Sequence, residues 1–359
     1  MKLAILTDIH FGARSDSPFI LDTQEQFYSE VFFPECKARG IDHLLLLGDT
    51  FENRKSVNIL TLHRSRKMFF DKLLAEGFSV TAILGNHDVY YRHDNSVNIM
   101  SHIADMYPNI NLIQGNGVIT LGDLNIGLVS WINRSNYEDA KKFISGLENV
   151  PILCGHFEIN GFDMTPGRPC EGGMPREMFD KFERVLSGHF HCITDDGKIK
   201  YISNNTQTNW SDLHEKKGFH VLDTLTRDLT HIVNPNDVFL RVEYNMLPDP
   251  VAFDVESHCK GKIVRVAIPS FLEVNHDALS IFVDRVAGVA HSVETIETSI
   301  LVKDIDSDMV VERQEGDLSD IIRTYVDETV DSDAIDKNRL KMMLDELLTD
   351  ARQMIGDDV

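Results

Sequence analysis

The chain has 359 residues, 42% of them hydrophobic, and a formal net charge of −22 at pH 7. It is long enough for one large domain with smaller appendages and can fill a sizeable core. Nowhere do roughly 18 apolar residues run together, and the first residues lack a basic region, so we expect neither membrane insertion nor export. The five cysteines show no paired spacing, which predicts reduced thiols in a cytoplasmic protein.

Four short apolar runs, at residues 3–6, 44–47, 80–84 and 152–154, each lead into a polar motif. Such runs are typical of buried strands. Between them lie helical stretches, for example residues 23–39 and 59–76, so strand and helix alternate through the first half. This alternation predicts strands whose carboxyl ends meet at one edge, where open sheets bind ligands.

The polar motifs consist of residues that bind hard metal ions. There are five: Asp8-Ile-His10, Gly48-Asp49, Gly85-Asn86-His87-Asp88, Gly155-His156 and Gly188-His189-Phe190-His191. Two divalent ions about 4 Å apart need nitrogen and oxygen ligands around each ion and one carboxylate shared by both, and they need no cysteine. We expect the ligands of one ion to be Asp8, His10, Asp49 and His191, and those of the other to be Asp49, Asn86, His156 and His189.

His87 is left without a metal in this assignment. A water between two divalent ions becomes a hydroxide nucleophile near neutral pH. We therefore expect His87 to be catalytic, either by hydrogen-bonding a phosphate oxygen or by protonating the leaving alkoxide.

Each motif has an ordinary explanation when taken alone. An aspartate after a strand often caps a helix, Gly-Asp and Asn-His-Asp occur in plain turns, and paired histidines are often surface residues. Glycine-flanked motifs of metal-ligand type that follow apolar runs in one order favour a two-metal phosphoesterase over these explanations.

The five motifs resemble those of the calcineurin-like metallophosphoesterase superfamily. Asp-x-His, Gly-Asn-His-Asp and Gly-His-x-His are similar to its DNA nucleases, and the chain resembles the SbcD-type nucleases of bacteria and phages over nearly its whole length. This resemblance implies a DNA exonuclease and endonuclease that uses two divalent ions, manganese with magnesium as the alternative. It also implies a homodimer that works with an SbcC-type coiled-coil ATPase, in the host cytoplasm if a phage encodes it.

The chain departs from cellular SbcD-type nucleases at Glu52, where those proteins usually have a histidine. His63 is a conceivable substitute, although its position favours a helix surface. The related protein phosphatases have a Gly-Asp-x-x-Asp-Arg-Gly run and Gly-Asn-His-Glu, whereas this chain has Glu52, Asn53, Arg54 and Asp88 at the differing positions.

The remaining elements predict an α/β fold with three parts. Strands at residues 198–202, 218–222 and 229–233 are expected to complete the second half of a two-sheet sandwich flanked by helices, so the nuclease core spans residues 1–245. A small α/β cap domain follows at residues 246–303, with a strand at 262–268, a helix capped by Asn275 and a strand at 296–302. Residues 304–359 form an acidic tether and a C-terminal helix pair.

The second tail helix, at residues 334–355, carries an apolar stripe at helical spacing. The two tail helices could pack on their own core. The acidic run before them and the family resemblance instead favour docking of the pair on the coiled coil of the ATPase.

The charge argues at first sight against DNA, because DNA affinity comes largely from lysine and arginine. Residues 304–359 hold 17 acidic and six basic residues, a net charge of −11, which is half of the total. The catalytic part is thus less acidic than the sum suggests, and we expect the isolated chain to bind DNA weakly.

The sequence is compatible with more than one dimer surface and more than one function. The dimer is expected around residues 59–70 and 90–106, but apolar residues there, such as Leu62, Met68 and Phe69, could equally belong to the core. The same metal site could serve a small-molecule phosphodiesterase or phosphatase. A noncatalytic binding module is the third possibility, which the intact ligand set disfavours.

Overall fold

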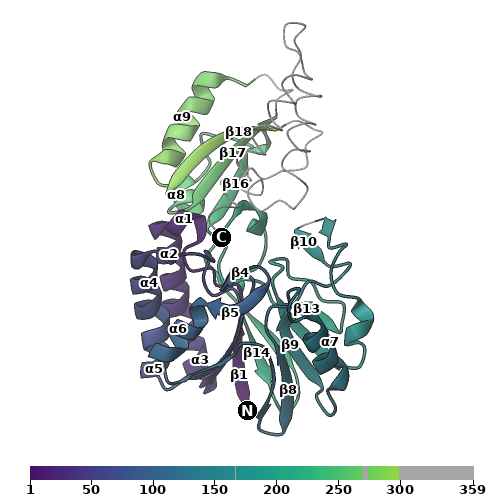
Figure 1. Cartoon of the computed structure of the whole chain (residues 1–359). Helices are drawn as coiled ribbons and strands as arrows, with labels where there is room; N and C mark the ends of the chain where they lie inside the picture. Colours follow the sequence, from purple (N-terminus) through teal and green to yellow (C-terminus); the bar gives the residue numbers. More distant parts are fainter. Residues whose placement is uncertain (166, 270–273, 299–359) are drawn as a thin grey trace, which may run out of the picture. The chain divides into compact units, whose positions relative to one another are not determined.

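Two β-sheets form the centre of the molecule. The computed structural model describes residues 1–165, 167–269 and 274–298, and the expected tether and helix pair lie outside them. The first sheet has the strand order β15-β14-β1-β2-β3-β6 (Figure 1). Its strands are β1 (Lys2–Leu6), β2 (His43–Leu47), β3 (Ser79–Ile83), β6 (Ile110–Ile113), β14 (Gly218–Asp223) and β15 (Leu229–Val233). The first four run parallel, and β14 pairs antiparallel with β1 and β15.

The second sheet has the order β13-β12-β9-β8-β7. Its strands are β7 (Asn116–Leu121), β8 (Leu124–Val129), β9 (Ile152–His156), β12 (Arg184–Gly188) and β13 (Ile199–Tyr201). All neighbours are parallel except β7 and β8. The strands expected at residues 218–222 and 229–233 exist, but they extend the first sheet, and only β13 joins the second.

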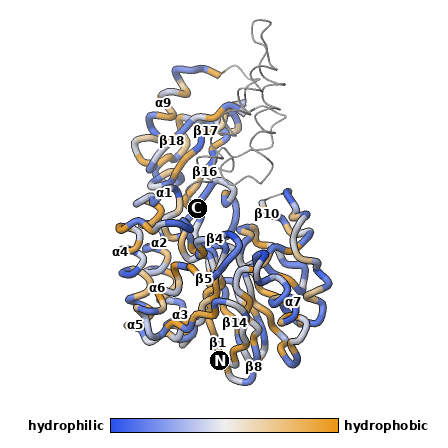
Figure 2. Tube along the Cα trace, in the orientation of Figure 1, coloured by the Kyte–Doolittle hydropathy of each residue, from blue (hydrophilic) through white to orange (hydrophobic). Residues whose placement is uncertain are grey.

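Alternating side chains pack the two sheets together. Leu3 and Ile5 of β1 lie in one apolar cluster with Ile126 and Leu128 of β8, whereas Leu6 faces the cluster beneath the helices. All are at most 1% exposed, and each such side chain contributes about 1.5–3 kcal/mol when fully buried. Figure 2 shows hydrophobic residues along these central strands. The predicted two-sheet α/β sandwich is confirmed.

Helices cover the outer faces of both sheets (Figure 1). The first sheet is covered by α2 (Pro18–Phe27), α3 (Phe33–Arg39), α4 (Ile59–Ser65), α5 (Asp71–Ala75) and α6 (Ile99–Met106), and the second by α7 (Tyr137–Gly146). The helices expected at residues 23–39 and 59–76 are present, each with a π-helical turn, at Tyr28–Phe32 and Arg66–Phe70. The short element α1 (Ala13–Asp16) is a left-handed turn at Arg14 and Ser15. Among the described helices, none has the length and apolar character required to cross a bilayer.

A smaller three-stranded parallel sheet follows the sandwich. It contains β16 (Phe239–Glu243), β17 (Ile263–Pro269) and β18 (Ser292–Thr298), and its helices are α8 (Val255–Cys259) and α9 (His276–Ala287). The side chain of Asn275 accepts a hydrogen bond from the backbone N–H of Ala278, as expected of a helix cap. β18 begins four residues before the expected strand at 296–302, of which residues 299–302 lie outside the described part of the chain. β16 precedes the expected domain boundary at residue 245 yet pairs with β17.

Two hairpins and three 3₁₀ helices complete the described part of the chain. They are β4 (Val89–Tyr91) with β5 (Asp94–Asn98), β10 (Asp163–Thr165) with β11 (Arg168–Pro169), and the 3₁₀ helices Arg176–Phe179, Trp210–Asp212 and Tyr244–Met246. All five cysteines are buried and unpaired.

Candidate metal centre

The predicted site residues follow the carboxyl ends of five strands. Asp8, Asp49 and Asn86 come two or three residues after β1, β2 and β3 of the first sheet. His156 ends β9 of the second sheet, and His189 directly follows β12. Both sheets therefore contribute side chains to one site.

The backbone at this site is unusually strained. Asp8, His10, Asp49 and His189 have φ angles of 49°, 52°, 50° and 90°. Residues with a Cβ rarely adopt this left-handed region, and each such residue costs on the order of 1–3 kcal/mol. The four strained residues among the predicted ligands therefore lower the stability of the fold, and in return their side chains point into the site.

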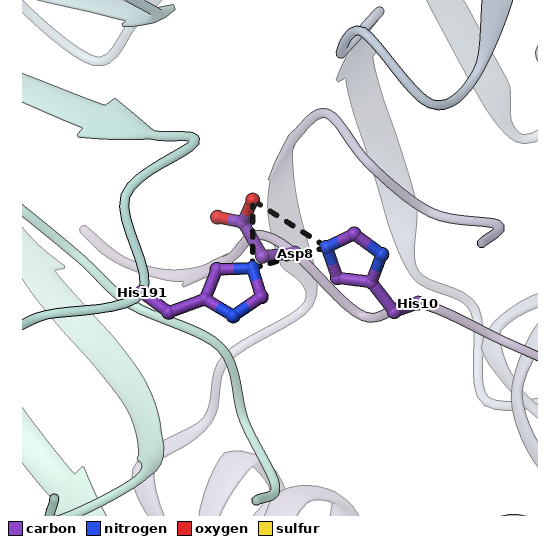
Figure 3. Close-up of side chains that lie close together, drawn as sticks. All are labelled: Asp8, His10 and His191. Carbon is purple, nitrogen blue, oxygen red and sulfur yellow. Dashed lines mark hydrogen bonds and ion pairs between the residues drawn. The ribbon is translucent and has the colours of Figure 1, made fainter. Parts of the chain in front are cut away.

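Asp8, His10 and His191 form the first donor group (Figure 3). The Nε2 atoms of the two histidines face each other at 3.1 Å, and each lies 3.9 Å from Oδ1 of Asp8. Oδ2 of Asp49 lies 3.8 Å from Nε2 of His10. The four predicted ligands of the first ion are therefore brought together.

Asp49, Asn86, His156 and His189 form the second donor group. Oδ1 of Asn86 lies 3.0 Å from Nε2 of His156 and 2.8 Å from Nδ1 of His189. Oδ2 of Asp49 lies 3.2 Å from the same His156 nitrogen. The same oxygen faces His10 of the first group, so Asp49 lies where a carboxylate would bridge two ions.

These residues fit a pair of divalent cations. Two ligands of one octahedral ion, each about 2.1 Å from it, lie within about 4.2 Å of one another, and the measured separations of 2.8–3.9 Å meet that limit. The donors are imidazole nitrogen, carboxylate oxygen and amide oxygen, which suit manganese and magnesium better than thiophilic metals.

The amide of Asn86 lies between the two histidines of the second donor group. Its amide oxygen points at Nε2 of His156 and Nδ1 of His189. Its amide nitrogen lies 3.2 Å from Nη2 of Arg54. The reversed amide would form hydrogen bonds with all of these groups and would suit the site without metal. The orientation with the oxygen inward is the one that a bound cation would favour.

The electrostatic environment also favours positive charge. Burial lowers the pKa of His10, but the carboxylates of Glu52, Asp49 and Asp8 outweigh it and raise this pKa to about 10. Burial likewise lowers the pKa of His156, and Asp49 with Asp8 raises it to about 9. Divalent cations and protons would thus compete for these nitrogens.

Three of the four histidines in the donor groups have an oxygen within about 3 Å of their other ring nitrogen. Such partners fix the orientation of metal-ligating histidines. They are Glu52 Oε2 at 2.6 Å from His10, the Leu47 carbonyl at 2.9 Å from His156 and Glu158 Oε1 at 3.1 Å from His189. Asp212 Oδ1 lies 4.0 Å from Nδ1 of His191, within ion-pair distance but too far for a hydrogen bond. The sequence did not reveal these roles. Only Glu158 offered a signal, because it lies two residues after His156 along an extended segment.

Asp212 belongs to a buried polar network behind His191. Its Oδ1 lies 2.7 Å from Nζ of Lys217, and both side chains are at most 2% exposed. Lys217 also donates to the His191 carbonyl at 3.0 Å and to Ser203 Oγ at 3.1 Å. Burial raises the pKa of Asp212, but Lys217 and His191 outweigh it and hold this pKa well below its usual range. The network therefore fixes the backbone that carries His191.

Asp88 braces the site without facing either donor group. Its carboxylate accepts hydrogen bonds from the backbone N–H groups of Thr50 at 2.9 Å, Phe51 at 3.3 Å and Gly85 at 2.9 Å. Burial and the nearby Asp49 raise its pKa to about 6. Asp88 thus joins the loop after β2 to the loop after β3.

His87 lies beside the first donor group. Its backbone N–H donates to Oδ1 of Asp49 at 2.7 Å, and its Nδ1 lies 2.6 Å from the carbonyl oxygen of Glu52. Its ring packs edge-on against the ring of His10, with the two ring centroids 4.9 Å apart. His63 is exposed on α4, in agreement with the expected helix surface.

Comparisons with known proteins agree with this geometry. Residues 1–192 match the family model of the calcineurin-like phosphoesterases. The chain is 25% identical over 362 residues to Exonuclease subunit 1 of Enterobacteria phage T4, across 98% of this chain and 100% of that protein.

Two solved structures each cover 65% of this chain. One is a novel archaeal phosphodiesterase, with a TM-score of 0.34, 13% identity and 100% of its own chain covered. The other is a hypothetical protein from Thermus thermophilus, with a TM-score of 0.35, 12% identity and 97% of its chain covered. On the strength of the family match, the chain belongs to the calcineurin-like phosphoesterases, a family of metal-dependent phosphoester hydrolases.

Proposed function

We propose that this chain is the nuclease subunit of an SbcC/SbcD-type complex that processes DNA ends in recombination and repair, in the cytoplasm of a host cell. It would cleave phosphodiester bonds as a manganese-dependent exonuclease and endonuclease. The observation that carries the proposal is the convergence of two donor groups on the shared carboxylate of Asp49. The match to a phage exonuclease subunit over almost the whole chain supports DNA as the substrate.

The ligands proposed for the two ions are those of the two donor groups. When bound, two divalent ions would activate a water and neutralise phosphate charge. His87 is proposed as the catalytic acid. Because the carbonyl of Glu52 lies 2.6 Å from its Nδ1, that nitrogen carries the proton, and Nε2 is the atom that would exchange a proton with the substrate.

The test is cleavage of end-labelled linear duplex DNA with manganese. We expect wild type to degrade the DNA and His87→Ala to lose about 10²–10⁴-fold in rate, the usual contribution of a general acid. His63→Ala, which removes an exposed imidazole from α4, is the matched control and should cleave like wild type. Manganese binding by His87→Ala, measured by calorimetry, should remain.

The alternative is a small-molecule phosphodiesterase or phosphatase with the same metal site. It predicts hydrolysis of bis-para-nitrophenyl phosphate without degradation of DNA under any condition, with or without the ATPase. That result would reject the nuclease proposal.

The ATPase partner is proposed to bind the C-terminal helices at residues 318–359, which lie outside the described residues. The apolar stripe of the last helix supports this assignment. We expect deletion of residues 318–359 to leave manganese binding intact and to abolish association with the ATPase. Co-purification of the truncated chain with the ATPase would contradict it.

A homodimer is proposed through the helical segment at residues 59–70 and the segment at residues 90–106. Met68 and Phe69, which were candidates, are buried in the core, whereas Ile59 is 86% and Val97 47% exposed. We expect Ile59→Asp to halve the mass measured by light scattering. Leu225→Asp, at an equally exposed position on another part of the chain, should leave the mass unchanged.

A further inference from the structure

Glu52 is placed beside His10 by the backbone. The loop after β1 pairs with the loop after β2, since His10 N–H donates to the Asp49 carbonyl at 3.1 Å and Phe11 N–H to the Thr50 carbonyl at 2.9 Å. Glu52 N–H then donates back to the Phe11 carbonyl at 3.1 Å. This ladder fixes the position of Glu52 relative to His10 before any side-chain contact is considered.

The carboxylate of Glu52 lies behind His10 as seen from the donor group. Its Oε2 is 2.6 Å from Nδ1 of His10, whereas Nε2 of the same ring faces Asp8, Asp49 and His191. The His10 ring therefore separates Glu52 from the first donor group, and the carboxylate contacts a ligand without joining the ligands. The contact is an ion pair without a well-aligned hydrogen bond.

The main chain of Glu52 contacts a second histidine. Its carbonyl oxygen lies 2.6 Å from Nδ1 of His87. Substitution of the side chain removes the contact with His10 and leaves the carbonyl in place. The two contacts can therefore be separated by mutation.

We infer that Glu52 is a positioning residue, whose carboxylate holds His10 with Nε2 directed at the first ion and whose carbonyl holds His87. Carboxylates behind ligating histidines set the orientation and basicity of the ring, and their loss typically lowers metal affinity or activity 10–100-fold. A carboxylate at this position also repels a phosphodiester, so Glu52 supports the metal site and does not bind substrate. The inference rests on the proposed metal-dependent function.

The experiment compares Glu52→Ala and Glu52→Gln with wild type in calorimetric titrations of Mn²⁺ into metal-free protein. We expect the alanine variant to bind one of the two ions about 10–100-fold more weakly and the other unchanged. Glutamine keeps an oxygen that can accept from Nδ1 of His10, so it should restore part of the affinity. Glu171→Gln, an exposed position, controls for the loss of one negative charge.

Activity on bis-para-nitrophenyl phosphate gives the second readout. In Glu52→Ala, the Mn²⁺ concentration for half-maximal rate should rise about 10–100-fold, while kcat at saturating Mn²⁺ recovers toward wild type because the contact with His87 remains. Unchanged Mn²⁺ binding in both variants would overturn the inference. So would a kcat that stays low at saturating Mn²⁺ with both ions bound.

The readouts are independent of the DNA substrate. If two Mn²⁺ ions bind and the variants shift as expected while DNA is never cleaved, the nuclease proposal fails and the role of Glu52 stands. Circular dichroism of each variant confirms that it is folded, and the glutamine variant keeps the test valid if alanine unfolds the loop.

Discussion

Gly188 provides a direct test of how tightly the metal centre is packed. A Cβ added at Gly188 would lie 2.0 Å from Oγ1 of Thr7 and 2.9 Å from both Oδ2 of Asp8 and Nδ1 of His156. Real Cβ atoms do not approach neighbours at 2.0 Å, so Gly188→Ala must displace a buried side chain. Thr7 is fully buried, and its hydroxyl lies 2.8 Å from Oδ2 of Asp8 and 3.0 Å from the Leu47 carbonyl.

The cost follows from these contacts. Overpacking of a filled core destabilises by about 1–3 kcal/mol, and loss of the Thr7 hydrogen bond adds about 1 kcal/mol. We therefore expect Gly188→Ala to lower the free energy of unfolding by about 2–4 kcal/mol. Because Thr7 moves together with Asp8, manganese affinity should fall as well.

Urea unfolding followed by circular dichroism measures the first effect, and calorimetric titration with Mn²⁺ measures the second. Gly146→Ala is the matched control, since a Cβ there meets nothing within 4 Å and the residue lies in α7. It should be neutral or slightly stabilising. An ordinary surface change alters the free energy of unfolding by no more than about 0.5 kcal/mol. If Gly188→Ala changes it by no more than that and binds Mn²⁺ like wild type, Gly188 is not closely packed against Thr7.

Three further predictions concern charge and metal. Lys217→Met should lower the free energy of unfolding, measured in urea titrations, by about 3–5 kcal/mol, because it leaves the buried charge of Asp212 without its cation. A loss under about 1 kcal/mol would contradict the pairing of Asp212 with Lys217. Burial and the stacked His231 lower the pKa of His220 to about 2 in the folded protein. Between that pH and the ordinary histidine pKa of 6.5, His220 therefore binds a proton in the unfolded chain and not in the folded chain. The contribution of His220 to stability should therefore be constant above about pH 6.5 and should fall by about 1.4 kcal/mol per pH unit below it. His220→Phe should accordingly lose less stability than wild type between about pH 6.5 and lower pH, and equal slopes for the two proteins would refute this. Chelation of bound metal should lower the Tm of wild type by calorimetry, whereas a Tm independent of metal would argue that the donor groups bind none.

Local sequence patterns are enough to predict the strands and the donor residues. Apolar runs ending in Asp8, Asp49 or Asn86 identify both a buried strand and the residue that follows it, and parallel strands bring such residues to one edge. That is why the seven proposed ligands could be named and why the structure places them in two groups. The motif spacing also left His87 as the remaining imidazole.

The pairing of distant strands and the backbone strain could not be predicted from the sequence. β14 reads as a strand, but its place beside β1 depends on contacts between residues about 220 apart. The partnership of Asp212 with His191 spans 21 residues through a buried network with no local signature. The left-handed backbone at Asp8 and His10 was equally hidden, because neither residue is a glycine and only the surrounding fold imposes that conformation.

The division of the ligands between two sheets has a consequence for folding. Asp8, Asp49 and Asn86 follow strands of the first sheet, and His156 and His189 follow strands of the second. Bound cations would link the two sheets, because neither sheet alone provides a complete set of donors. A partly folded chain would therefore lack a complete set of donors, and the proposed hydrolysis would require both sheets to be in place.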